Sequence, residues 1–180
     1  DVGWADAGVI VPYTIYKLSG SLDIIKENYS AMKKYMDFFL KRRGNKGPFI
    51  RYGDWLSFED NSDEIQEYLS VCFYAYDALL MSEMANAIGI EEDKNYYQSI
   101  YEKQKEYFIK TYLNEDGSIK LDTQTVLLYA LKLNLVPSSA IDTVKKQLID
   151  NFSKNDFTLQ TGFLGTAILL PTLTEIGFED

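Results

Sequence analysis

Two short segments place a carboxylate close to an indole, a combination suited to binding sugars. They are Gly3-Trp4-Ala5-Asp6 and Gly53-Asp54-Trp55. The face of an indole packs on the C–H groups of a sugar ring, and a carboxylate accepts hydrogen bonds from sugar hydroxyls. A structural alternative stays open for each: Asp6 as the N-cap of a first helix, and Asp54 in a glycine turn next to a core Trp55. Trp4, Asp6, Asp54 and Trp55 are therefore the candidate substrate-binding residues.

An acidic cluster offers oxygen ligands for a cation. It consists of Glu59, Asp60, Asp63, Glu64 and Glu67. The spacing does not fit an EF-hand loop, and the turn glycine of that loop is missing. Acidic residues in a first helical turn also interact favourably with the helix dipole. We therefore expect a helix start at this cluster, with no metal site and no cofactor.

Two further segments carry polar residues at predicted helix starts. Asp122-Thr123-Gln124 predicts an N-cap at Asp122. Thr161-Gly162-Phe163-Leu164-Gly165-Thr166 has two glycines three positions apart. No lysine follows them, and neither the P-loop nor the dinucleotide pattern fits. Close helix packing at Gly165 is the preferred interpretation.

Composition excludes several classes of protein. The 180 residues contain no histidine and one cysteine, so a histidine-based triad, a histidine-ligated zinc site and an internal disulfide are impossible. With 18 Lys+Arg against 27 Asp+Glu, the net charge of −9 argues against nucleic acid or an anionic membrane as partner. The low cysteine content is compatible with the cytoplasm without establishing it. Glycoside hydrolysis needs two carboxyl groups, but spacing selects no pair among 27 acids, so no catalytic residue is assigned.

Apolar residues recur at helical spacing along nearly the whole chain, which predicts an all-α fold of seven helices. The predicted helices cover approximately residues 6–18, 22–39, 65–87, 97–112, 126–131, 141–152 and 164–173. Pro12 lies inside the first and should kink it or mark a late start. Short and long connections alternate, and short connections join antiparallel hairpins. The pattern predicts three helical hairpins and a seventh helix, with the long connections at one end.

The long connections carry the candidate residues, and a loop of about twenty residues such as 43–64 is uncommon unless it has a function. We therefore expect these connections to form a common rim that binds a ligand. A closed ring of six hairpins would need about twice as many residues. The chain is accordingly expected to be a fragment, or to self-associate through the apolar faces of a half-ring.

Four segments resemble bacterial α-L-rhamnosidases, the family-78 glycoside hydrolases, in the order and approximate spacing of that family. They are residues 3–16 (GWADAGVIVPYTIY), 52–56 (YGDWL), 122–125 (DTQT), and 159–166 (LQTGFLGT) with Leu169-Leu170-Pro171. The resemblance covers essentially the whole chain. It implies that residues 1–180 are about half of an (α/α)6 toroid, a partial six-hairpin glycosidase domain. It also implies inverting hydrolysis of terminal α-L-rhamnosides.

In that family a carboxylic acid protonates the leaving oxygen and a carboxylate activates water on the opposite face. The resemblance implies that the acid lies upstream of the segment matching Asp1 and the base downstream of the segment matching Asp180. The chain contains neither motif and is expected to be inactive by itself. It also implies that Trp4, Asp6, Asp54 and Trp55 line the sugar pocket. The alternatives are a non-catalytic helical-hairpin scaffold that binds a protein and a sugar-binding module without hydrolysis.

Overall fold

The protein, described here by a computed structural model over residues 1–43 and 51–178, is built from α-helices. Within these residues there is no β-strand, only an isolated bridge between Leu113 and Ile119. The helices are α1 (Ala7–Ser19), α2 (Asp23–Arg43), α3 (Asp63–Ala87), α4 (Glu91–Tyr112), α5 (Gln124–Lys132), α6 (Ile141–Lys154) and α7 (Phe163–Glu175), with a short 3-10 turn at Ser138–Ala140. The all-α prediction and its seven helices are confirmed. Residues 44–50 of the long connection after α2 lie outside the described residues.

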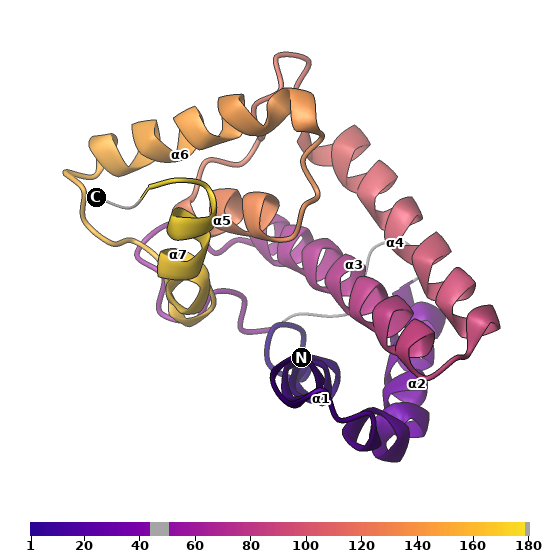
Figure 1. Ribbon diagram of the computed structural model, residues 1–180. Helices are drawn as coiled ribbons and strands as arrows, with labels where there is room; N and C mark the ends of the chain where they lie inside the picture. Colours follow the sequence, from indigo (N-terminus) through magenta and orange to yellow (C-terminus); the bar gives the residue numbers. More distant parts are fainter. Residues whose placement is uncertain (44–50, 179–180) are drawn as a thin grey trace.

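Consecutive helices pack as hairpins. α1 packs on α2, α3 on α4, and α5 on α6. The odd-numbered helices also touch in order, α1 on α3, α3 on α5 and α5 on α7. The result is a row of inner helices backed by outer ones, as expected for about half of an (α/α)6 toroid (Figure 1). Within the described part of the chain, α7 has no hairpin partner.

α3 is the central element of the core. It contacts α1, α2, α4 and α5, and crosses the middle of the molecule (Figure 1). Its sequence is apolar on nearly all sides, which is typical of a helix surrounded by others. The fully buried side chains of α3 include Tyr68, Leu69, Leu80, Met81 and Met84. A rigid α3 therefore fixes the positions of the connections that begin and end beside it.

The long connections meet one another at one rim. The N–H of Phe58 donates to the carbonyl of Gln160 at 2.9 Å, which joins the connection before α3 to the one before α7. The N–H of Gln124, at the start of α5, donates to Glu59. The chain before α1 joins them through the contact of the Trp4 ring with Phe163. The shared rim is confirmed. One part of the connection between α4 and α5, the bridge between Leu113 and Ile119, lies away from the rim and against α6, where Gln147 binds Ile119.

Two expectations about helix ends need correction. The N-cap of α5 is Thr123, whose hydroxyl accepts from the N–H of Val126, and not Asp122. The carboxylate of Asp122 instead pairs with Lys154 on α6 at 3.0 Å. Of the two alternatives for Pro12, the late start is wrong, since α1 begins at Ala7 and continues through it, and the kink stays a prediction.

None of the helices in residues 1–43 and 51–178 combines the length and apolarity needed to cross a bilayer.

Candidate functional site

An aromatic pocket lies on the rim. Trp4, Tyr52, Trp55 and Phe163 line a cavity of about 450 Å³. All four rings are partly exposed, although aromatic side chains gain from burial. Trp4 contacts Phe163 with ring centroids 6.0 Å apart, and Tyr52 contacts Trp55 at 5.1 Å. Two pairs of rings from three separate segments therefore form one apolar concavity.

The backbone joins two walls of this pocket directly. The N–H of Phe163 donates to the carbonyl of Trp55 at 2.9 Å. A Cβ on Gly162 would lie 2.3 Å from that same carbonyl oxygen, so only glycine permits this approach. Gly53 has φ +55°, and a Cβ there would meet the side chain of Asn61 at 2.1 Å. The motif glycines are needed for these two close approaches.

Asp54 lies beneath the aromatic pocket and links three segments. Its side chain is 1% exposed. Its carboxylate accepts from the N–H groups of Gly162 and Leu164, both at 2.7 Å, and of Gly165 at 3.1 Å. The hydroxyl of Thr125 on α5 donates to it at 2.5 Å. These N–H groups belong to the first turn of α7, where a negative charge interacts favourably with the helix dipole.

Gly165, whose N–H binds this carboxylate, lies close to a side chain of α5. A Cβ on Gly165 would lie 2.1 Å from the Thr125 hydroxyl and 2.8 Å from Thr161. The prediction of close packing at Gly165 is therefore confirmed. Its small size lets α7 approach α5 closely enough for Asp54 to bind both.

Asp6 is a second buried carboxylate, bonded to the residue before Trp4. It is 0% exposed and occupies the N-cap position of α1, but its side chain makes no capping bond. The carboxylate instead accepts from the N–H of Gly3 and, at 2.8 Å, from the hydroxyl of Tyr35 on α2. Burial, followed by the charge of Asp6, raises the pKa of the Tyr35 hydroxyl. Asp6 therefore ties the turn that carries Trp4 to α2.

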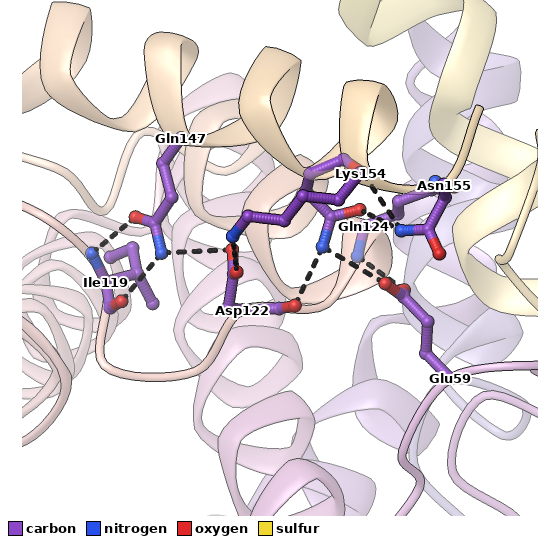
Figure 2. Close-up of polar contacts among 8 residues, drawn as sticks. Glu59, Ile119, Asp122, Gln124, Gln147, Lys154 and Asn155 are labelled. Atoms are coloured by element: carbon purple, nitrogen blue, oxygen red, sulfur yellow. Dashed lines mark hydrogen bonds and ion pairs between the residues drawn. The ribbon is translucent and has the colours of Figure 1, made fainter. Parts of the chain in front are cut away.

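Glu59 organises a second polar network behind the rim. It accepts from the N–H of Gln124 at 2.6 Å and from the side-chain amide of Asn151 on α6 at 3.1 Å. Figure 2 shows this network with the neighbouring contacts of Asp122 to Gln147 and Lys154. Burial raises the pKa of Glu59, and its two hydrogen bonds oppose that rise. This member of the acidic cluster therefore joins α5 to α6 through the connection.

The four candidate residues thus divide into two pairs. Trp4 and Trp55 reach the same cavity, whereas Asp6 and Asp54 are buried behind it with their oxygens already bonded. Contact of any of the four with a sugar stays a prediction. In residues 1–43 and 51–178 no group of three or more acidic or cysteine side chains is arranged to hold a metal ion.

Sequence reasoning missed two pocket walls and one anchor. Tyr52 and Phe163 were noted only as parts of motifs, and Thr125 only as the end of one. The available signal for Tyr52 and Phe163 was that each is an aromatic residue next to a motif glycine. Thr125 carried no such signal, because its role depends on the approach of α7 to α5.

Comparison with known proteins identifies close structural relatives. Residues 1–180 match the sequence model of the bacterial alpha-L-rhamnosidase 6 hairpin glycosidase domain. An alpha-L-rhamnosidase of Streptomyces avermitilis is 31% identical over 179 residues, which make up 99% of this chain and 17% of that protein. One of Formosa agariphila is 31% identical over 189 residues, covering 99% of this chain and 20% of that protein.

Solved structures agree with these matches. The Streptomyces avermitilis alpha-L-rhamnosidase complexed with L-rhamnose superposes with a TM-score of 0.91 at 30% identity, over 99% of this chain and 17% of that one. The alpha-L-rhamnosidase of Dictyoglumus thermophilum gives 0.90 at 28% identity, over 98% and 21%. That of Aspergillus terreus, at 23% identity over 98% and 22%, shares the fold with a TM-score of 0.86. The chain spans about a fifth of the length of these relatives.

Proposed function

The chain belongs to the bacterial alpha-L-rhamnosidase six-hairpin glycosidase domain family, and on that premise we propose that its aromatic pocket binds the terminal sugar of an α-L-rhamnoside. The observation that carries the proposal is the convergence of Trp4 and Trp55 on one cavity from distant parts of the chain. Indole rings offer flat apolar faces to the C–H groups of a sugar. A relative with the same fold has been solved in complex with L-rhamnose.

The two buried carboxylates support the pocket in this proposal. Asp54 fixes the first turn of α7, and with it Phe163, while Asp6 fixes the turn that carries Trp4. Asp54 already accepts four hydrogen bonds, so direct contact with a sugar would require it to release some of them, which leaves buried donors unpaired at a cost of about 1–3 kcal/mol each. Asp6 is 0% exposed behind the turn that carries Trp4. Their burial therefore favours a role behind the aromatic rings.

We further propose that residues 1–180 do not hydrolyse a rhamnoside by themselves. An inverting glycosidase needs one acid and one base on opposite faces of the sugar, with room for a water between them. Among the described residues, those that line the aromatic pocket are all aromatic. The buried acids Asp6 and Asp54 bind backbone N–H groups and hydroxyls of the protein itself. The chain therefore supplies the sugar pocket of the domain and leaves the acid and the base to other residues.

The same all-aromatic lining also favours the alternative of a sugar-binding module without hydrolysis. The two proposals predict the same behaviour for the isolated chain, and they differ in the activity expected once flanking sequence is added. The alternative of a protein-binding scaffold is less favoured. Most of the exposed aromatic residues lie on the rim, including Trp4, Tyr52, Trp55 and Phe58, although Phe38 on α2 and Tyr96 on α4 are exposed elsewhere.

Activity measurements on the 180-residue protein test the proposal. Incubation with an aryl α-L-rhamnoside should release no aglycone, while L-rhamnose should change the tryptophan fluorescence saturably. Replacement of Trp55 by Phe should weaken that response, and replacement of the exposed Tyr96 on α4 by Phe should leave it unchanged. Turnover by the purified chain that Asp54→Ala abolishes would overturn the proposal that it lacks the catalytic groups.

A further inference from the structure

Gln124, the first residue of α5, is a buried polar residue that the proposed function does not use. Its side chain is 0% exposed. The Nε2 atom donates to the carbonyl of Thr158 at 3.1 Å, and the Oε1 atom accepts from the N–H of Gln160 at 2.9 Å. A buried amide is costly unless it is hydrogen-bonded, and both ends of this one are bonded to the same connection. The side chain therefore holds residues 158–160, which precede α7, against the start of α5.

The segment 158–160 belongs to no helix, so its backbone groups need partners from other segments. Gln124 supplies one donor and one acceptor. The carbonyl of Gln160 also accepts from the N–H of Phe58 at 2.9 Å and from the hydroxyl of Ser57 at 3.1 Å. This segment is thus bonded to α5 through the Gln124 side chain and to the connection before α3 through the carbonyl of Gln160.

The path from this segment to the aromatic pocket is short. Gln160 lies three positions before Phe163, and Phe58 lies three positions after Trp55. Phe163 and Trp55 are two walls of the pocket, and the N–H of Phe163 donates to the carbonyl of Trp55 at 2.9 Å. The backbone contacts at Gln160 and at Phe163 therefore set how the two connections lie beside each other. Gln124 fixes one of these connections to α5.

The backbone of Gln124 binds the other connection as well. Its N–H donates to the Glu59 carboxylate at 2.6 Å, so one residue is bonded to both connections. We propose that Gln124 is a positioning residue, whose side-chain amide keeps the two connections in the arrangement that places Trp55 and Phe163 as walls of the aromatic pocket. The effect on sugar affinity rests on the proposed function, whereas the position of the two rings is a property of the free protein.

Gln124→Met tests the position of the connections without a sugar. Methionine is unbranched and of similar length, but its thioether donates no hydrogen bond. Hydrogen exchange of the Phe58 and Phe163 N–H groups should become about tenfold faster relative to that of the Leu69 N–H, because the connections open locally. Leu69, which is fully buried on α3, serves as the reference for global unfolding. The ratio of rates therefore separates a local effect on the rim from a general loss of stability.

Gln104→Met is the matched control. Gln104 is 2% exposed on α4, and in the part of the chain that the structure describes its Oε1 atom has no hydrogen-bond partner. This substitution should leave the ratio of exchange rates unchanged. An equal ratio in Gln104→Met and Gln124→Met would overturn the positioning role.

Titration with L-rhamnose measures the consequence for the pocket. Gln124→Met should bind L-rhamnose about tenfold more weakly than the unmodified chain, because the pocket is less often in its binding-competent form. Gln104→Met should bind it as the unmodified chain does. If the unmodified chain binds no rhamnose, the proposed function fails, and the exchange ratio still decides the role of Gln124. If Gln124→Met binds rhamnose as tightly as the unmodified chain, the positioning role is overturned.

A measurement on the unmodified chain covers the case in which Gln124→Met does not fold. The side-chain NH₂ group of Gln124 should exchange with solvent about a hundredfold more slowly than in the urea-unfolded chain, because it is buried and bonded to Thr158. Nitrogen-15 NMR resolves this group. Exchange at the rate of the unfolded chain would show that the amide does not hold the connection, and the proposal would be wrong.

Discussion

Asp54 joins three segments of the rim through its buried carboxylate. One carboxylate accepts three N–H bonds from the first turn of α7 and one hydroxyl bond from α5. Hydrogen bonds to a charged group are stronger than neutral ones, and these are shielded from water. The residue therefore joins the connection before α3 to two helices that follow it by more than 60 positions.

Removing that carboxylate should be costly. We expect Asp54→Ala to lower the free energy of unfolding by about 3 kcal/mol or more, because several buried donors lose their acceptor. Asp54→Asn should cost less, since its amide oxygen still accepts. Urea unfolding followed by circular dichroism measures the change. The exposed Asp150→Ala on α6 is the control and should stay within about 0.5 kcal/mol; an equal effect of both substitutions would refute the anchoring role of Asp54.

The sequence placed two tryptophans and two aspartates in one candidate pocket, whereas in the structure the indoles reach the cavity and the carboxylates are buried behind it. A tryptophan close to an aspartate is the same sequence pattern whether the carboxylate faces a ligand or binds the backbone. Which way Asp54 points depends on the first turn of α7, which lies more than 100 positions away.

At the scale of elements, helix periodicity was sufficient to predict the seven helices of the described residues, because apolar side chains recur at helical spacing in each of them. Their ends were less predictable. Asp122 and Thr123 both suit an N-cap, and Thr123 takes the position while Asp122 binds Lys154 on α6. The choice depends on α6, which local sequence does not reveal.

The approach of α7 to α5 can be tested at a single glycine. A Cβ at Gly165 would overlap the Thr125 hydroxyl, so Gly165→Ala should lower the free energy of unfolding by about 2 kcal/mol despite the better helix propensity of alanine. Gly8→Ala in α1 is the matched control, since nothing lies within 4 Å of its Cβ position. It should be neutral or stabilise by up to about 1 kcal/mol. If both substitutions stabilised the protein, close packing at Gly165 would be refuted.

At the scale of the whole molecule, three hairpins and α7 form a row of inner helices with a common rim. Alternating connection lengths were sufficient to predict that arrangement, because a short turn forces antiparallel neighbours and leaves the long connections together at the other end. The residues that line the pocket on the rim were predicted less well, since Tyr52 and Phe163 complete the pocket through tertiary contacts. The expectation that the chain self-associates through the faces of the half-ring stays a prediction.

The central claim is that the aromatic pocket formed by Trp4, Tyr52, Trp55 and Phe163 binds a sugar. The two indole N–H groups give separate signals in a nitrogen-15 NMR spectrum, which reports on both tryptophans at once. On titration with L-rhamnose, both signals should shift together and saturate at one dissociation constant, and Phe163→Ala should weaken that binding. If neither indole signal moves at the highest L-rhamnose concentration reached, or if the two signals shift with different dissociation constants, the account is contradicted.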